Sequence, residues 1–319
     1  MQRRTNQGGG LLEKMEQLFE AARFSQLFER GDLVATKVQV GERGNTTHLR
    51  PELVKRIVRK VHQHGGRPFV TDTGSEGCRG DAVSHTLLAA EHGFELVTLG
   101  APFLVADGLD GQDAVMVRTE GKLLREVPVA THLYRAKAII AIAHFTAGPI
   151  YGWHGALYNL GYLGMARNLR QQPNRELASA TKGAGESSGS NGMIPDIMTL
   201  KASQRWLVEA FYAIAQLKEQ RLGFVNVLVD ITPDPDGYPW SDAPIVPDIG
   251  ILASRDPVAL DQASADFVNG QEGLPGTRLR DPRTRDKLAD LNPSVDWSFS
   301  LAYAEELGLG TRDYELLII

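Results

Sequence analysis

Apolar residues recur along the chain in two patterns, short runs rich in β-branched residues and longer stretches with helical spacing. The short runs predict strands over residues 33–40, 69–71, 94–99, 103–106, 138–143, 224–230 and 248–254, and a hairpin over 115–118 and 126–129. The helical spacing predicts helices over residues 11–30, 51–64, 82–92, 198–217 and 257–267. Alternation of this kind is typical of an α/β fold. The pattern therefore predicts a mostly parallel sheet with helices on both faces, in Rossmann-like layers and in two lobes.

The polar and small residues between these runs divide the chain into parts. Residues 181–192 are rich in glycine and serine, a composition typical of a mobile linker. We predict a disordered tail over residues 1–9, an α/β lobe over 10–167, a flexible linker over 168–197, and a second α/β portion over 198–319 that packs on the first. Within that second portion, residues 270–319 are rich in turn-forming residues, and their sequence indicates no functional role.

Composition and charge limit the class of protein. The 319 residues are 42% hydrophobic and 23% charged, close to the average for globular proteins, which excludes a disordered chain. The formal net charge of −5 argues against a nucleic-acid binder, which normally carries a basic patch or stripe. No run approaches the roughly eighteen apolar residues of a membrane span, and the start of the chain lacks the apolar stretch of a signal peptide. We expect a cytoplasmic protein with no nucleic-acid or membrane partner. The sequence leaves open whether the protein forms a homo-oligomer.

The chain has a single cysteine, Cys78. One thiol excludes an intramolecular disulfide and any site built from several thiolates, such as a zinc ribbon or an ordinary iron–sulfur cluster. A catalytic thiolate needs a neighbouring base, and the sequence places none beside Cys78. A structural cysteine is therefore favoured over a nucleophile.

Four polar residues come directly after predicted strands: Asp72, Asp107, His144 and Asp230. Ligands of open α/β sheets bind beyond the carboxyl ends of the strands, where parallel strands bring such side chains together. We predict His144, Asp72 and Asp107 as catalytic residues. Thr73, Gly108 and Asp230, at the same strand ends, are predicted to bind the ligand. Strand ends also attract aspartate for turn geometry, so a structural role for each stays open.

The stretch 144–161 is the most unusual in the chain, with glycines among aromatic residues and two histidines directly after a strand. Such glycines let the backbone approach a ligand closely. We predict that His154, Gly155 and Asn159 bind the ligand and face the strand ends. Imidazole and carboxylate groups suit a divalent metal, with His144, His154 and Asp107 as candidate ligands, and they equally suit acid–base catalysis.

The glycine-rich loop 74–80 follows a predicted strand and precedes a predicted helix. Its glycine spacing differs from the dinucleotide-binding fingerprint. Backbone amides before a helix are placed to hold a phosphate or carboxylate, so anion binding is an alternative to an ordinary connection.

The sequence resembles the family known as domain of unknown function 362, whose members are often labelled iron–sulfur proteins. The resemblance extends over about residues 33–269 and rests on several motifs together. These motifs are residues 41–52, 69–73, 101–109, 144–145, 155–161 and 247–259. Thr146 and Tyr158 stand where members commonly have lysine, and residues 235–237 stand where many have a Cys-Asp-Cys motif. This is therefore a divergent member, for which we expect no iron–sulfur cluster.

These features predict a cytoplasmic enzyme or enzyme-like protein. It binds a small anionic molecule, with a divalent metal as an option, in a cleft at the carboxyl ends of the strands. The alternative is a non-catalytic binding or assembly subunit, derived from an iron–sulfur protein family, that has lost its cluster. The sequence names neither a substrate nor a reaction.

Overall fold

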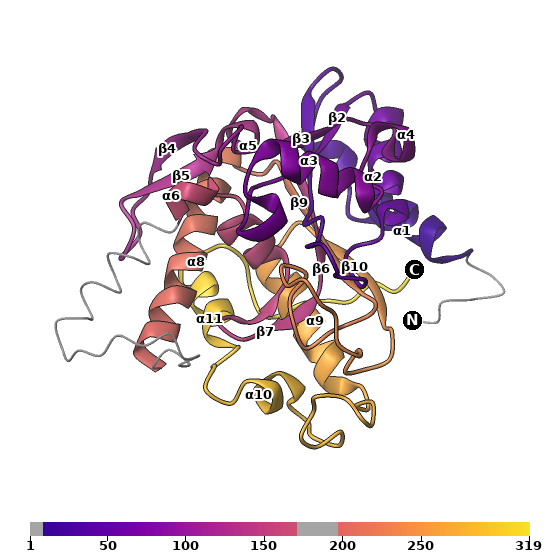
Figure 1. The fold of residues 1–319 in the computed structure, drawn as a ribbon, viewed down its shortest axis with the longest axis vertical. Helices are drawn as coiled ribbons and strands as arrows, with labels where there is room; N and C mark the ends of the chain where they lie inside the picture. Colours follow the sequence, from indigo (N-terminus) through magenta and orange to yellow (C-terminus); the bar gives the residue numbers. More distant parts are fainter. Residues whose placement is uncertain (1–8, 171–196) are drawn as a thin grey trace.

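The computed structural model describes residues 9–170 and 197–319 (Figure 1). Almost all of the predicted N-terminal tail and most of the predicted linker, including residues 181–192, lie outside the described residues. The fold is α/β, with a mostly parallel six-stranded sheet covered by helices.

The main sheet has the strand order β10-β9-β6-β1-β2-β3. Its strands are β1 (Leu33–Lys37), β2 (Arg67–Asp72), β3 (Phe103–Val105), β6 (Ala138–His144), β9 (Leu222–Leu228) and β10 (Gly250–Ser254). Neighbouring strands are parallel except β9 and β10, which are antiparallel. Because β9 pairs with β6, strands from before and after residues 171–196 share one sheet.

The register of the sheet places the ends of its strands at different heights. Lys37, the last residue of β1, pairs with Thr71 of β2 and Ala141 of β6. β6 continues beyond Ala141 to His144, which pairs with Val227 of β9. At a rise of about 3.3 Å per residue, His144 lies about 10 Å further along the strand direction than Lys37. The strand-end residues therefore lie along the same edge of the sheet but are not gathered at one position on it.

Helices cover both faces of the sheet (Figure 1). On one face lie α1 (Leu11–Ala21) and α2 (Pro51–Gln63), and on the other lie α8 (Ile197–Lys218), α9 (Pro257–Gly270) and α11 (Phe299–Glu306). The shorter elements are α3 (Ala82–Glu91), α4 (Leu96–Leu99), α5 (Thr131–Arg135), α6 (Arg167–Arg170) and α10 (Lys287–Leu291), with 3₁₀ turns at Phe24–Leu27 and Gly77–Arg79 and a π-helix at Tyr158–Tyr162. Within the described ranges, no helix has the length and apolar character needed to cross a membrane.

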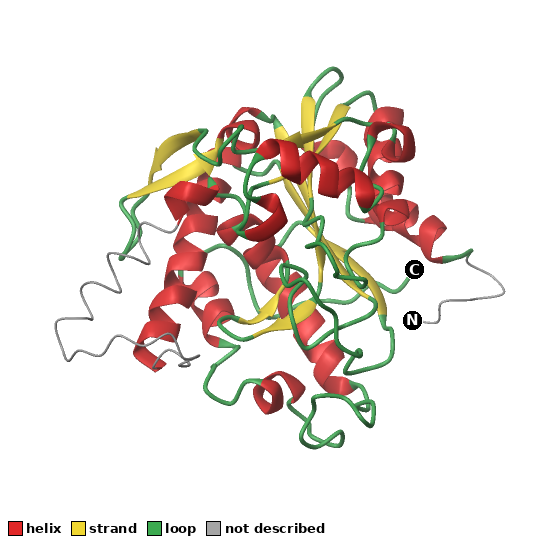
Figure 2. Cartoon of the chain, in the orientation of Figure 1, coloured by secondary structure: helices red, strands yellow, loops and turns green. Residues whose placement is uncertain are grey.

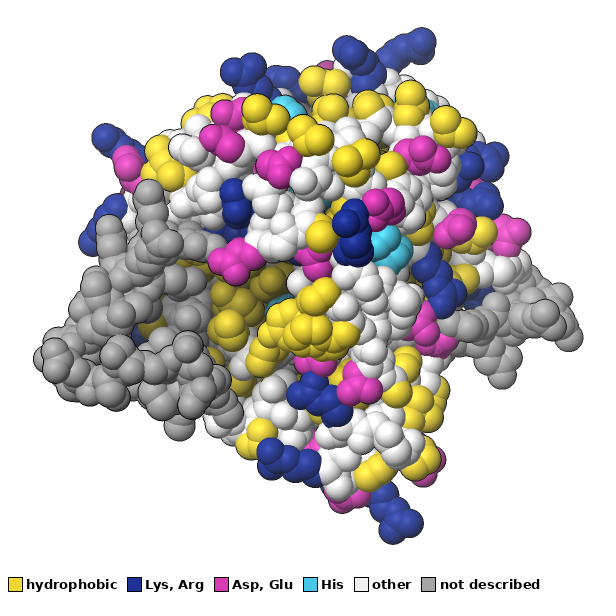
Figure 3. Space-filling model, in the orientation of Figure 1, with side chains coloured by type: hydrophobic (Ala, Val, Ile, Leu, Met, Phe, Trp, Pro, Cys, Tyr) yellow, Lys and Arg dark blue, Asp and Glu magenta, His cyan; other side chains and the backbone are white. Residues whose placement is uncertain are grey.

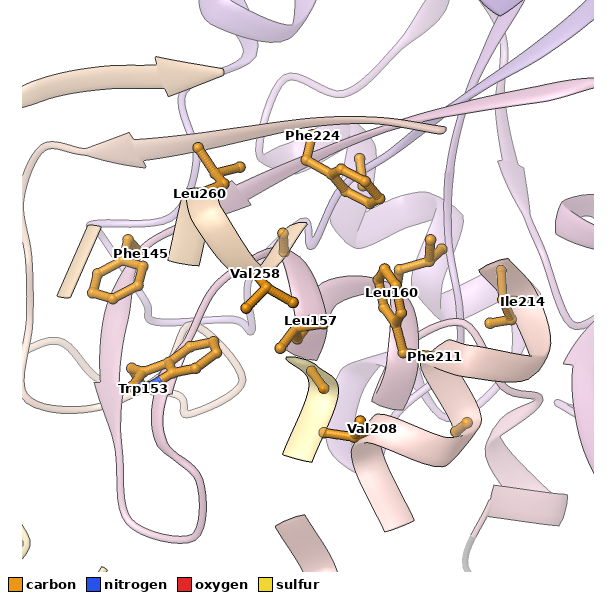
Figure 4. Close-up of a cluster of buried hydrophobic side chains, with 14 of the residues drawn as sticks. Phe145, Trp153, Leu157, Leu160, Val208, Phe211, Ile214, Phe224, Val258 and Leu260 are labelled. Atoms are coloured by element: carbon orange, nitrogen blue, oxygen red, sulfur yellow. The ribbon is translucent and has the colours of Figure 1, made fainter. Parts of the chain in front are cut away.

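Each face of the sheet has its own hydrophobic core, and β6 contributes to both. Ile139 and Ala141 belong to the core that includes the apolar side chains of α8 and α9 (Figure 4). Ile140 and Ile142 belong to the core that includes those of α1 and α2. A strand buried on both faces is a nearly continuous apolar run, which is why the sequence predicts β6 so clearly.

Two short antiparallel hairpins stand outside the main sheet (Figure 2). The predicted hairpin is formed by β4 (Ala114–Arg118) and β5 (Glu126–Ala130). The second, formed by β7 (Thr146–Gly148) and β8 (Gly152–His154), lies in the glycine-rich stretch. Gly152 has a φ of 87°, and a Cβ there would lie 2.4 Å from the side chain of Trp297. The turn therefore requires glycine at this position.

Glu209 of α8 fixes the turn of the β4–β5 hairpin. Its buried carboxylate accepts hydrogen bonds from the backbone N–H groups of Lys122, Leu123 and Leu124 at 2.7–2.9 Å. It also accepts the hydroxyl of Tyr303 in α11 at 2.7 Å. Burial raises the pKa of Tyr303, and the bond to Glu209 raises it further, so the hydroxyl remains a donor. One carboxylate thus joins α8, α11 and the hairpin.

Two predicted elements differ from the structure. Residues 94–99 were expected as a strand but contain the helical turn α4, which ends at Gly100 with a φ of 76°. A short apolar run is compatible with either conformation. The predicted helix 11–30 ends at Ala21, because Arg23 takes a left-handed φ of 55° and a 3₁₀ turn follows.

Candidate functional site

A cavity of about 680 Å³ is lined by the loops that follow β1, β2 and β9, by the π-helix and by α6. Its lining residues are Gln39, Glu42, Arg43, Ser75, Glu76, Gly77, Cys78, Arg79, Tyr158, Tyr162, Leu163, Arg170, Pro235, Gly237, Tyr238 and Pro239. The face of the molecule in Figure 3 is hollowed near its centre, where hydrophobic side chains gather. The cavity lies at the carboxyl ends of parallel strands, where open α/β sheets bind their ligands.

Lys37 at the end of β1 and Asp72 at the end of β2 form a fully buried ion pair, with 3.0 Å between Nζ and Oδ1. The ammonium also donates to the carbonyl of Val38 at 2.8 Å and to Oδ1 of Asn159 at 3.1 Å. These bonds use all three donors of the ammonium. Burial lowers the pKa of Lys37, and the Asp72 carboxylate opposes that effect.

Asp72 also positions Arg79, which lines the cavity. Oδ2 of Asp72 accepts a hydrogen bond from Nη1 of Arg79 at 3.1 Å, and Nε2 of His85 lies 3.6 Å from the same oxygen. Burial alone would raise the pKa of Asp72, but the surrounding cationic groups, with Lys37 foremost, hold it well below its usual range. Asp72 is therefore a permanently charged carboxylate that holds a buried guanidinium at the cavity wall.

Arg170 is a second buried guanidinium at the cavity wall, with 2% of its surface exposed. It donates to Oγ1 of Thr73 at 3.2 Å and to the carbonyl of Gly74, and it stacks 4.7 Å from the ring centroid of Tyr162. Among the residues that the structure describes, no carboxylate lies within ion-pair distance of Arg170. Within residues 9–170 and 197–319, the groups that contact its guanidinium are therefore neutral.

Glu42 contributes a buried carboxylate to the same cavity. Oε1 accepts the backbone N–H groups of Arg43 at 2.9 Å and of Cys78 at 3.1 Å. Gly77, with a φ of 79°, lets the loop approach, since a Cβ there would lie 2.9 Å from Oε2. Oε2 lies 3.8 Å from Nε of Arg79, and neither atom has a hydrogen-bond partner among the described residues.

Comparison with known proteins places the chain in a family. The family model described as Domain of unknown function (DUF362) matches residues 34–266, more than half of the chain. The chain belongs to this family. No protein of curated function matches it.

Among solved structures, this DUF362 protein is similar to the lactate racemase apoprotein from Thermoanaerobacterium thermosaccharolyticum, with 13% sequence identity and a TM-score of 0.50. The match covers 81% of this chain and 56% of that one, so the chain spans little more than half of the length of its structural relative. At this identity the similarity extends to the α/β fold alone.

The iron–sulfur label often given to DUF362 members implies a cluster, which needs several thiolates. Cys78 is the single cysteine of this chain, and a hydrogen bond with Glu42 raises the pKa of its thiol. The residues present therefore do not fit such a cluster.

Asp107, predicted as catalytic, accepts hydrogen bonds from the backbone of two neighbouring segments. Its carboxylate accepts the N–H groups of Gly74 and of Arg167, each at 2.9 Å, and it is fully buried. Gly108 follows with a φ of 77°, and a Cβ there would lie 2.1 Å from Asp113. Asp107 thus connects the loop that leads to Arg79 with the helix that contains Arg170, and Gly108 allows the chain to pass close to Asp113.

His144, the other residue predicted to act as acid or base, is enclosed by hydrogen-bond acceptors. Nδ1 lies 2.9 Å from the Asp236 carboxylate, and Nε2 lies 2.8 Å from the carbonyl of Val229 and 3.1 Å from that of Asp230. Two acceptors facing two ring nitrogens suit the imidazolium. Burial lowers the pKa of His144, but Asp236 and the carbonyls outweigh that effect and raise it overall.

We expect His144 to make stability depend on pH. Because its pKa is raised above the ordinary 6.5, its contribution is complete below pH 6.5 and is lost as the pH rises through the folded-state pKa. The difference in free energy of unfolding between wild type and His144→Gln should therefore shrink from pH 6 to pH 9 in urea titrations. The exposed His62→Gln is the control. A difference that stays constant over this range would contradict the charged state of His144.

The remaining predicted ligand-binding residues fall in separate surroundings. His154 stacks 3.8 Å from Tyr158, and burial lowers its pKa to about 3, so it is neutral. A Cβ on Gly155 would lie 2.4 Å from Asp261, so the close packing at this position requires glycine. Asp230 adopts a φ of 55° and pairs with Arg50 at a partly exposed position.

The three candidate metal ligands are not gathered into one site. Within residues 9–170 and 197–319, no three His, Cys, Asp or Glu side chains are placed to hold a metal ion. Both oxygens of Asp107 accept backbone N–H groups, and both nitrogens of His144 face acceptors. The metal prediction gains no support from the described side chains.

Of the predicted residues, Asp72, Thr73 and Asn159 are brought together, and the groups that connect them were missed. Those groups are Lys37, Arg79 and Arg170. Lys37 ends a strand as Asp72 does, but the predicted strand continued to residue 40 and concealed it. Arg79 lies in loop 74–80, which was predicted as a candidate anion site.

Proposed function

We propose that this DUF362 protein binds a small anionic molecule in the cavity at the carboxyl ends of its strands. Arg170 carries the proposal. A buried charge without an opposite charge is strongly unfavourable, by several kcal/mol, and a cation at a cavity wall is relieved of that cost when an anion binds. A guanidinium is also the side chain best suited to carboxylate and phosphate groups.

The balance of buried charge around the cavity supports the same conclusion. Lys37, Arg79 and Arg170 are buried cations, whereas Asp72 and Glu42 are the buried carboxylates beside them. The positive charges of Lys37 and Arg79 are balanced by the two carboxylates. Among the side chains that the structure describes, one positive charge is left over, and it lies on Arg170, which none of their carboxylates contacts. A ligand with one negative charge balances the site.

The size and lining of the cavity fit a small organic anion. Its volume of about 680 Å³ lies in the range typical of small-molecule sites. Tyr158, Tyr162 and Tyr238 give the lining aromatic surface beside the guanidinium groups. Burial raises the pKa of Tyr158, so its hydroxyl stays neutral and can donate to an anion.

We expect Arg170→Gln to weaken anion binding at least about tenfold, because a hydrogen bond to a charged group contributes about 1.5–3 kcal/mol. Isothermal titration calorimetry with acetate, phenylacetate and inorganic phosphate, at fixed pH and ionic strength, measures the loss. The matched control is Arg135→Gln, which removes an exposed arginine of α5 outside the cavity. Absence of binding by the wild type, or equal affinity in Arg170→Gln, would overturn the proposal.

A further inference from the structure

The loop between β9 and β10 places two aromatic side chains beside the cavity. Tyr238 is half-buried and belongs to the cavity lining, and Trp240 follows two residues later. Their ring centroids lie 4.8 Å apart, with 41° between the ring planes. Trp240 is 51% exposed, whereas the other three tryptophans of the chain are buried or partly buried. Tryptophan is highly buried on average, so an exposed indole beside a cavity requires an explanation.

The loop that carries these two side chains is anchored at several points. The backbone N–H of Tyr238 donates to the carbonyl of Pro235 at 3.1 Å, which closes a turn. Nε1 of Trp240 donates to Oδ2 of Asp234 at 3.2 Å, and the carbonyl of Trp240 accepts Nδ2 of Asn45 at 3.3 Å. The exposed indole is therefore held in place on both its side chain and its backbone.

The same loop lies close to the cationic wall of the cavity. A Cβ on Gly237 would lie 3.5 Å from Nη2 of Arg79 and 3.3 Å from Nε2 of Gln39. Tyr238, the next residue, and Arg170 both line this cavity. The cavity thus combines a wall of guanidinium groups with an aromatic wall, and a molecule that fills it contacts both.

Tyr238 differs from the other two tyrosines of the cavity in how its ring is packed. Tyr158 stacks with His154 at 3.8 Å and with Tyr162 at 5.3 Å between centroids. Tyr162 also stacks with the guanidinium of Arg170. Among the described side chains, the ring of Tyr238 has a ring contact with Trp240 alone. Tyr238 is therefore the lining tyrosine whose ring is left available to stack with a ligand.

We infer that the ligand is an aromatic monoanion, in which a carboxylate or similar group binds Arg170 and the ring packs against Tyr238 and Trp240. This inference rests on the proposed function and specifies its substrate class. The cavity of about 680 Å³ has room for both groups. Aromatic rings attract each other beyond the apolar area that they bury, so the two side chains favour an aromatic ring over a saturated ring of similar size.

The test compares phenylacetate with cyclohexylacetate, and with acetate as the acid without a ring, by isothermal titration calorimetry. In wild-type protein we expect phenylacetate to bind about threefold to tenfold more tightly than cyclohexylacetate. The hydrophobic effect alone favours the reverse order, because the saturated ring has the larger apolar surface. In Tyr238→Leu the ratio should fall to one or below, while acetate should bind as it does to wild type. Tyr134→Leu, at a 37% exposed position of α5 outside the cavity, should keep the wild-type ratio.

The outcomes separate this inference from the proposed function. Equal affinity of the two ring acids in wild-type protein, or tighter binding of cyclohexylacetate, overturns the inference and leaves anion binding intact. A preference for phenylacetate that persists in both Tyr238→Leu and Trp240→Leu also overturns it. Failure of all three acids to bind contradicts the proposed function itself. The wild-type comparison needs no variant, so it decides the matter even where Tyr238→Leu does not fold.

Discussion

Replacing Lys37 by methionine is expected to lower the free energy of unfolding by about 3–5 kcal/mol. The substitution leaves the carboxylate of Asp72 buried with Arg79 as its remaining hydrogen-bonded cation, and it removes the donor to Asn159. The cost comes chiefly from the partners left unsatisfied, since methionine fills most of the space of the lysine stem. Urea unfolding followed by circular dichroism measures the loss.

Two further variants test the reason for that loss. Lys55→Met, on the exposed face of α2, should change stability by less than about 0.5 kcal/mol. In the double variant Lys37→Met/Asp72→Asn, the carboxylate that was left without its lysine is gone. The combined loss should therefore be clearly smaller than the sum of the two single losses. Strict additivity would show that the ion pair is not the cause.

Replacing Glu209 by alanine is expected to cost a similar amount, about 3–5 kcal/mol, for a different reason. Three backbone N–H groups and the hydroxyl of Tyr303 lose their common acceptor. Each buried donor without an acceptor costs about 1–3 kcal/mol, and the more exposed ones recover part of this by binding water. The loss should appear in thermal and urea unfolding alike.

The neighbouring Glu306 provides a matched control, because it contacts the same hairpin turn through the side chain of Lys122 at a largely exposed position. Such a surface pair contributes at most about 1 kcal/mol, so Glu306→Ala should leave stability almost unchanged. Glu209→Gln, which keeps one acceptor oxygen, should recover part of the loss. Equal stability of Glu209→Ala and Glu306→Ala would exclude the anchoring role of Glu209.

The sequence predicts the fold well where burial produces a long pattern. β6 and β9 are apolar on both faces, and α2 and α9 begin at a proline, so each leaves a clear signal. The signal fails for the short apolar run at residues 94–99, whose length fits a strand or one helical turn equally well. For this segment, the choice between strand and helix depends on contacts with distant parts of the chain, and the local sequence pattern does not reveal those contacts.

The candidate site was predicted only in part, because its key contacts join distant segments. The strand-end rule identifies Asp72, but a lysine at the end of β1 has the same local sequence whether it is solvated or buried. In the fold the ammonium of Lys37 donates to Asn159, 122 residues further along the chain. The rule also identifies Asp107 and His144, but it does not reveal that their hydrogen-bonding atoms contact loops from other parts of the chain.

The pairing of β6 with β9 has a consequence for the protein during its synthesis. β6 ends at His144 and β9 begins at Leu222, so nearly eighty residues are translated between them. At about 5–20 residues per second, the ribosome needs roughly 4–16 s for that stretch. Throughout this time the most apolar strand of the sheet has an unpaired edge, and such edges readily associate with other chains. The nascent chain therefore has to be shielded, by its own earlier helices or by a chaperone, until β9 emerges to complete the sheet.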